Sequence, residues 1–71
     1  MEFDYRKLAG KIREVFGKQS AFAAALGLSE RSLSLKMSNQ RYFKMPEIYR
    51  AVQLLGLQQS DIPDYFFTLK V

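Results

Sequence analysis

The sequence contains neither cysteine nor histidine, and each absence excludes a class of chemistry. Without cysteine the chain has no disulfide, no thiolate metal site and no thiol nucleophile. Without histidine it lacks the commonest general base and the commonest metal ligand. We therefore expect no enzyme, no metal site and no cofactor.

Long apolar runs are also missing. The longest nearly apolar stretch, Ala21 to Leu28, has eight residues, whereas a helix needs roughly 20 to cross a bilayer. Glu2 and Asp4 stand near the N-terminus with no apolar block behind them, which is unlike a signal peptide. The 71 residues, 48% hydrophobic and 25% charged, predict one small soluble domain in the cytoplasm, with no membrane partner.

Positive charge is concentrated in the middle of the chain, whose net charge is +4. Residues 18–50 carry six basic and two acidic side chains, residues 1–17 carry four and three, and residues 51–71 carry one and two. Between Arg31 and Lys44, both included, there are four cations and no anion. This distribution favours a surface for a polyanion, and the alternative is an ordinary solvated face.

The apolar residues recur at helical spacing and are interrupted at glycine and proline. An all-α domain of five short helices is therefore expected. The first expected helix is capped by Asp4 and ends at Gly17, with an inward stripe that includes Val15. The second covers about 19–26, and the third is opened by Ser29 and runs to about Ser38. The fourth has Pro46 as its first residue and ends at Gly56, and a short fifth segment is capped by Ser60.

The segment 19–39 has the spacing of a helix-turn-helix. Ala23 is small, as required where two helices cross closely, and Gly27 stands where the chain must turn with positive φ. Ser29 caps the next helix, and Leu33 is placed to hold that helix against the one before it. An alanine, a glycine four residues later and a branched apolar residue six beyond that are typical of this motif.

The segment resembles the helix-turn-helix of the phage-repressor family, also called the XRE family, which includes lambda-type repressors and Cro proteins. The residues in common are Gln19, Ala23, Gly27, Ser29 and Leu33. The resemblance implies a five-helix lambda-repressor-like DNA-binding domain in a small Cro-like regulator of phage or prophage origin. It further implies a Cro/repressor-like transcriptional regulator that occupies a double-stranded operator as a dimer, through the major groove, with its effect on transcription, repression or activation, left open.

Three positions depart from the family pattern. Lys18 stands where the family often has Thr or Ser, and Asn39 is followed by Gln40 where the family often has Asn-Gly. Lys36 occupies a position that is often apolar in the motif. These departures leave the register at the end of the third helix open.

Helical geometry gives the third helix an outward face that could read base pairs. At 100° per residue from Leu33, Arg31, Leu35 and Ser38 lie at about 160°, 200° and 140°, away from the core, and Ser34 flanks them. Arg31 is expected to bond guanine, unless it forms a salt link with a nearby carboxylate. The two serines reach bases or phosphates, or are simply solvated. Leu35 contacts a thymine methyl or, alternatively, a protein partner.

A second group is expected to contact phosphates or to position the helix on DNA. Gln19 has this role by the resemblance, and Glu30 either accepts a hydrogen bond from cytosine or favours the helix dipole. The group comprises Gln19, Ser29, Glu30, Lys36, Asn39, Arg41 and Lys44. Tyr42 and Phe43, which lie among these cations, are expected to pack the loop onto the core.

A protein from another functional class fits the same residues. Leu35 on the outward face and the modest positive charge also suit a phage antirepressor or modulator that binds another repressor protein. The aromatic residues 65–67 could close the core or form a homodimer patch, so the oligomeric state stays open. A sequence-specific DNA-binding transcriptional regulator is the main expectation, and the modulator is the alternative.

Overall fold

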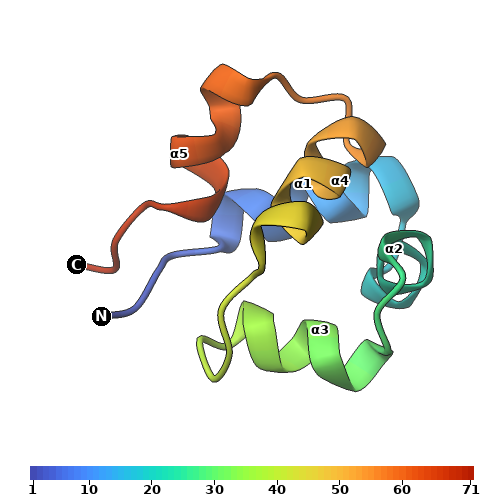
Figure 1. Cartoon of the computed structure of the whole chain (residues 1–71), viewed down its shortest axis with the longest axis horizontal. Coiled ribbons are helices and arrows are strands. Elements are labelled where there is room, and N and C mark those ends of the chain that lie inside the picture. Colours follow the sequence, from blue (N-terminus) through green and yellow to red (C-terminus); the bar gives the residue numbers. More distant parts are fainter.

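The computed structural model describes residues 1–71 as five α-helices, one short 3-10 helix and no strand beyond a single bridge. The expected all-α class is confirmed. In chain order the elements are α1 (Arg6–Phe16), α2 (Gln19–Leu26), α3 (Glu30–Met37), α4 (Met45–Leu54), η1 (Gln59–Asp61) and α5 (Ile62–Phe66) (Figure 1).

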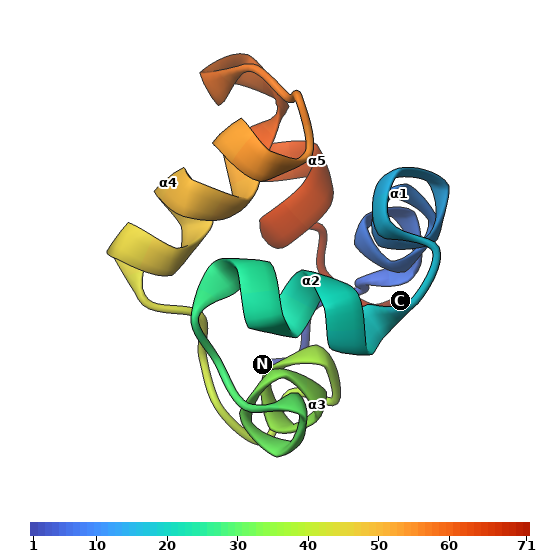
Figure 2. The ribbon, with the colours of Figure 1, turned by 90° about the vertical axis from the view of Figure 1, so that its right-hand side faces the viewer.

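Helix α2 lies at the centre of the packing and contacts α1, α3 and α4. Figure 2 shows it crossing the middle of the molecule with α3 beneath it. Helix α5 closes the other side against α1 and α4. The buried apolar core draws on the five helices and on Tyr5, and comprises Tyr5, Leu8, Ile12, Phe22, Ala23, Leu26, Leu33, Ile48, Ala51, Leu55 and Phe66.

The helix ends follow from local hydrogen bonds. Helix α2 has the predicted bounds, and α3 follows Ser29, whose hydroxyl accepts a hydrogen bond from the Ser32 backbone N–H at 3.0 Å. Helix α4 begins at Met45, one residue before the expected Pro46, because Glu47 folds back and accepts the Lys44 backbone N–H.

Three expectations about the outer helices are wrong. Helix α1 begins after Tyr5, and the Asp4 carboxylate instead accepts the Arg6 backbone N–H and pairs with its guanidinium. Val15, expected in the inward stripe, is exposed. Ser60, expected as a cap, lies inside η1, where Asp61 accepts the Gln58 backbone N–H.

The two chain ends lie side by side and are tied to the end of α3 (Figure 1). Phe3 and Leu69 form an isolated antiparallel bridge. On its other edge, Phe3 donates its backbone N–H to Asn39 Oδ1 at 2.7 Å, and its carbonyl accepts from Asn39 Nδ2 at 2.9 Å. Asn39 has φ +68°, so the expected left-handed conformation is confirmed.

Aromatic side chains close the core near these ends. Phe43 packs edge-to-face on both Tyr5 and Phe66, with ring centroids 5.5 and 5.3 Å apart. Phe66 is buried, whereas Phe67 is 48% exposed and contacts Phe3 at its edge. The prediction that the loop aromatics pack onto the core is thus confirmed for Phe43 and wrong for Tyr42, which is 69% exposed.

Candidate interaction surface

The corner between α2 and α3 fixes how α3 stands on the domain. Gly27 is left-handed, with φ +84° and ψ +21°, and its N–H reaches the carbonyls of Ala23 and Ala24. The N–H of Leu28 also bonds the Ala23 carbonyl, at 2.9 Å. Because the corner closes on these bonds and Leu33 is fully buried, the opposite face of α3 is turned outward.

The outward face of α3 carries most of the residues expected to read DNA. Arg31, Ser34 and Ser38 are exposed, but Leu35 is only partly exposed. At the first residue of α2, Gln19 Nε2 donates to Ser34 Oγ at 3.2 Å, which joins the two helices across this face. The face is therefore polar, with one free guanidinium and little apolar area.

Lys36 points inward, contrary to the expected phosphate contact. It is 5% exposed, and its ammonium pairs with the carboxylate of Glu47 on α4. The same carboxylate accepts the Lys44 backbone N–H at 2.9 Å. Burial raises the pKa of Glu47, but the hydrogen bonds from Lys36 and Lys44 and their positive charge outweigh it, so its pKa lies below the ordinary value. The ammonium of Lys36 is not available to a phosphate.

Other members of the expected positioning group also serve the fold. The Asn39 amide accepts one hydrogen bond from Phe3 and donates one to it, which fixes the amide against the N-terminal segment. The Ser29 hydroxyl caps α3. Glu30 lies exposed in the first turn of α3, where its charge favours the helix dipole. Arg41 and Lys44 remain exposed in the connection between α3 and α4.

The cations that form no ion pair are gathered in the middle of the chain. Of eleven lysine and arginine side chains, five form ion pairs, which also engage five of the seven carboxylates. The six others are Arg13, Lys18, Arg31, Arg41, Lys44 and Arg50. All of these except Arg13 lie within residues 18–50, so the excess charge there is uncompensated.

Large apolar side chains are exposed in the same part of the chain. Tyr42 is 69% exposed, Met45 67% and Tyr49 50%. Met45 and Tyr49 are one turn apart on α4, so they share a face of that helix. Aromatic residues, methionine and arginine are enriched in protein–protein interfaces. This combination favours a protein partner over a solvated face.

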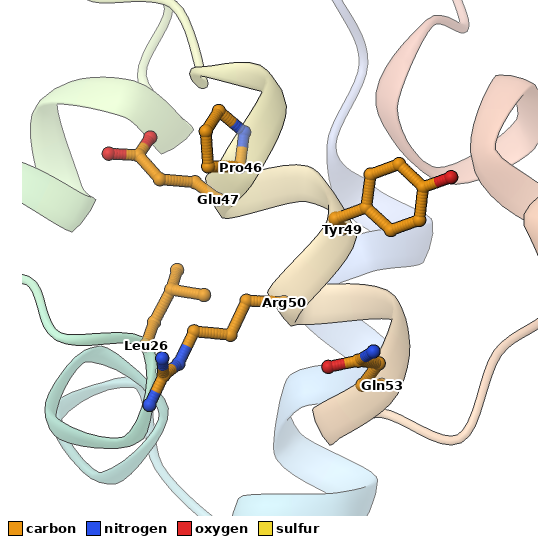
Figure 3. A pocket seen from close by; sticks show the side chains of 6 residues that line it. All are labelled: Leu26, Pro46, Glu47, Tyr49, Arg50 and Gln53. Carbon is orange, nitrogen blue, oxygen red and sulfur yellow. The ribbon is translucent and has the colours of Figure 1, made fainter.

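A groove of about 460 Å³ runs between α4 and the end of α2 (Figure 3). Its lining residues are Leu26, Pro46, Glu47, Tyr49, Arg50 and Gln53. In Figure 3 the Arg50 side chain extends from α4 toward α2 and passes Leu26. Its Nε donates to the Ala25 carbonyl at 3.2 Å. The groove combines the Arg50 cation with a lining that is partly apolar and partly polar.

Neither a metal centre nor a membrane span is found in the structure. No three side chains among His, Cys, Asp and Glu gather in one place. None of the helices combines the length and the apolar character that crossing a bilayer requires.

Two features escaped the sequence reasoning. The pairing of Lys36 with Glu47 was signalled only by a lysine at a position that is often apolar in the motif. The Arg50 groove had no sequence signal, because it depends on how α4 packs beside α2.

A solved structure is similar to this one along its whole length. That structure is the solution structure of the modulator of repression (MOR) of the temperate bacteriophage TP901-1 from Lactococcus lactis. The two share 51% sequence identity and a TM-score of 0.83, over 100% of this chain and 96% of the other. Among curated proteins no match is found.

These findings correct two expectations. The main functional expectation, a Cro-like repressor that itself binds an operator, is wrong, because the full-length likeness is to a modulator of repression; the alternative reading is the better one. The assignment to the phage-repressor (XRE) family is also wrong. The matching family is described as "Protein of unknown function (DUF739)", and its match covers residues 1–69. The chain belongs to the DUF739 family.

Proposed function

We propose that this chain is a phage modulator of repression that acts by binding a repressor protein. The observation that carries the proposal is the full-length likeness to MOR of bacteriophage TP901-1. The helices pack around one buried core, and we expect the effect to come from contact of this domain with a partner. We expect that contact to alter how the repressor occupies its operator.

The fold would serve this role as a modified helix-turn-helix. We assign α2 and α3 to a helix-turn-helix within a five-helix lambda-repressor-like arrangement, which the left-handed Gly27 and the Ser29 cap support. The same scaffold can carry different functions, so the arrangement does not by itself require DNA as the ligand.

The repressor would be bound by a surface that we call the α3–α4 face. Its support is the coincidence of unpaired cations and exposed apolar side chains in one stretch of chain. The face comprises Arg31, Ser34, Ser38, Arg41, Tyr42, Lys44, Met45 and Tyr49. Its apolar members would supply buried contact area, and its cations would select an acidic region of the repressor.

Fluorescence anisotropy of a labelled operator duplex tests the proposal. The duplex is first bound by the purified repressor of the phage that encodes the chain, and the chain is then titrated in. We expect the anisotropy to change in proportion to added chain until a fixed stoichiometry is reached. With the duplex alone, we expect no change at the same concentrations.

Matched variants locate the contact. Met45→Glu places a charge in the α3–α4 face, whereas Val15→Glu places one at another exposed apolar position, on α1. We expect the first variant to lose its effect on the repressor and the second to keep it. A chain that binds the duplex by itself, and leaves the repressor's affinity for the operator unchanged, would contradict the proposal.

A further inference from the structure

The groove between α2 and α4 holds a guanidinium that the rest of the chain only partly satisfies. Arg50 donates its Nε–H to the Ala25 carbonyl, one of the last carbonyls of α2. It forms no ion pair, and its terminal nitrogens donate no hydrogen bond to the chain. Four N–H donors therefore remain, on a side chain whose direction is already fixed.

The one carboxylate that lines the groove does not compensate this charge. Glu47 lies at the groove margin, but its carboxylate is engaged by the Lys36 ammonium and the Lys44 backbone N–H. In Figure 3 it points away from Arg50, toward α3. The free charge in the groove is therefore positive and is centred on Arg50.

The walls around Arg50 are suited to a peptide rather than to a free anion. Leu26, Pro46 and Tyr49 provide apolar surface, and Tyr49 is half exposed. Arginine and tyrosine are both enriched among the residues that dominate protein–protein binding energies. A carboxylate with an apolar neighbour in the partner chain would match both parts of the groove.

We propose that this groove binds a segment of the repressor in which an Asp or Glu carboxylate pairs with the Arg50 guanidinium. An apolar side chain next to that carboxylate packs on Pro46 and on the exposed edge of Leu26. The bond to the Ala25 carbonyl holds the guanidinium in place, so little side-chain freedom is lost on binding. This inference rests on the proposed function and names a specific contact within it.

Calorimetric titration of the purified repressor into variants of the chain tests the inference. Arg50→Gln removes the charge and is expected to raise the dissociation constant about tenfold or more, as for a buried charged contact. Arg50→Lys keeps the charge but loses the fork, and we expect an intermediate loss. Arg13→Gln, which removes an equally unpaired charge from α1, is expected to change the dissociation constant less than about twofold.

A second readout does not depend on substitution. The Nε–Hε resonance of Arg50 in the wild-type chain is expected to shift when the repressor is added, while that of Arg13 stays in place. Circular dichroism of each variant shows whether the helical fold is intact before binding is compared.

The outcomes separate this inference from the function on which it rests. If the wild-type chain binds the repressor, and Arg50→Gln binds equally well with an unmoved Arg50 resonance, the groove contact is refuted and the proposed function survives. If the wild-type chain does not bind the repressor, both fail. If sedimentation shows a dimer of the chain that Arg50→Gln dissociates, the groove holds a second copy, and the inference is overturned.

Discussion

Glu47→Gln is the substitution that most sharply tests how α3 is held against α4. The wild-type carboxylate neutralises the buried ammonium of Lys36 and accepts the Lys44 backbone N–H. Glutamine has nearly the same shape and can still accept that N–H through its amide oxygen. The substitution therefore removes one charge and leaves the Lys36 ammonium buried without a counterion.

The expected loss of stability is large for so small a domain. The Lys36 side chain is 6% exposed and that of Glu47 is 15% exposed, and breaking such a buried pair by removing one partner costs about 3–5 kcal/mol. A domain of 71 residues is typically stable by about 4–11 kcal/mol. Adding Lys36→Met removes the stranded ammonium, so we expect the double variant to recover most of the loss.

Urea unfolding, followed by the helical circular dichroism signal at neutral pH, measures this directly. At an m-value of about 1 kcal/mol/M, the Glu47→Gln midpoint should fall by roughly 3 M. The midpoint of the double variant, Glu47→Gln with Lys36→Met, should lie much closer to the midpoint of the wild type. If Glu47→Gln lowers the free energy of unfolding by less than about 1 kcal/mol, or if adding Lys36→Met lowers it further, the Lys36 ammonium is solvated and the reasoning is refuted.

Substitutions at three further positions have expected outcomes. Gly10→Ala should raise the melting temperature by the equivalent of about 0.5–1 kcal/mol, because an added Cβ meets no atom within 4 Å; a lower melting temperature would contradict this. Asn39→Gly should speed hydrogen exchange at the Phe3 amide, since both bonds to Phe3 are lost. Asn39→Ala should lower the free energy of unfolding by about 1 kcal/mol more than Asn39→Gly does, because alanine adopts the positive φ of this position less readily than glycine. The Arg6 side chain and its backbone N–H lower the pKa of the Asp4 carboxyl from 3.8 to about 2, so the stability that this carboxylate provides is lost as pH falls through that interval. In Asp4→Asn the free energy of unfolding should depend less on pH over the same interval, and an unchanged pH dependence would refute this.

Local rules predicted the parts of the fold that depend on neighbouring residues. The bounds of α2, the Ser29 cap and the left-handed Asn39 follow from hydrogen bonds and backbone preferences within a few positions. The cap of α1 was misplaced by one residue, since Asp4 can bond the Arg6 N–H without being the N-cap residue itself. Helix ends shift by this much because alternative caps differ little in energy.

Features that depend on distant residues could not be predicted in this way. Lys36 was assigned to the surface because a lone lysine is almost always solvated, and its burial depends on a carboxylate eleven positions along the chain. Phe3 and Asn39 are 36 positions apart, and neither signals the other. Their contact exists only after the chain ends meet.

The function was misjudged for a different reason. The spacing of Ala23, Gly27 and Leu33 describes how two helices meet at a corner, and it does not specify what the outer face binds. The basic middle of the chain was consistent with a polyanion and equally with an acidic protein surface. The distinguishing finding is the full-length likeness to a modulator of repression, which the residue pattern alone does not give.

The central claim, that the chain acts on a repressor protein through the α3–α4 face, is tested most directly by an NMR titration. Unlabelled repressor is added to the isotope-labelled chain in the absence of DNA, and an operator duplex is added to a second sample. We predict that the repressor shifts amide signals of residues 31–50 at low molar ratios and that the duplex shifts none. Shifts with the duplex alone, and none with the repressor, would contradict the account.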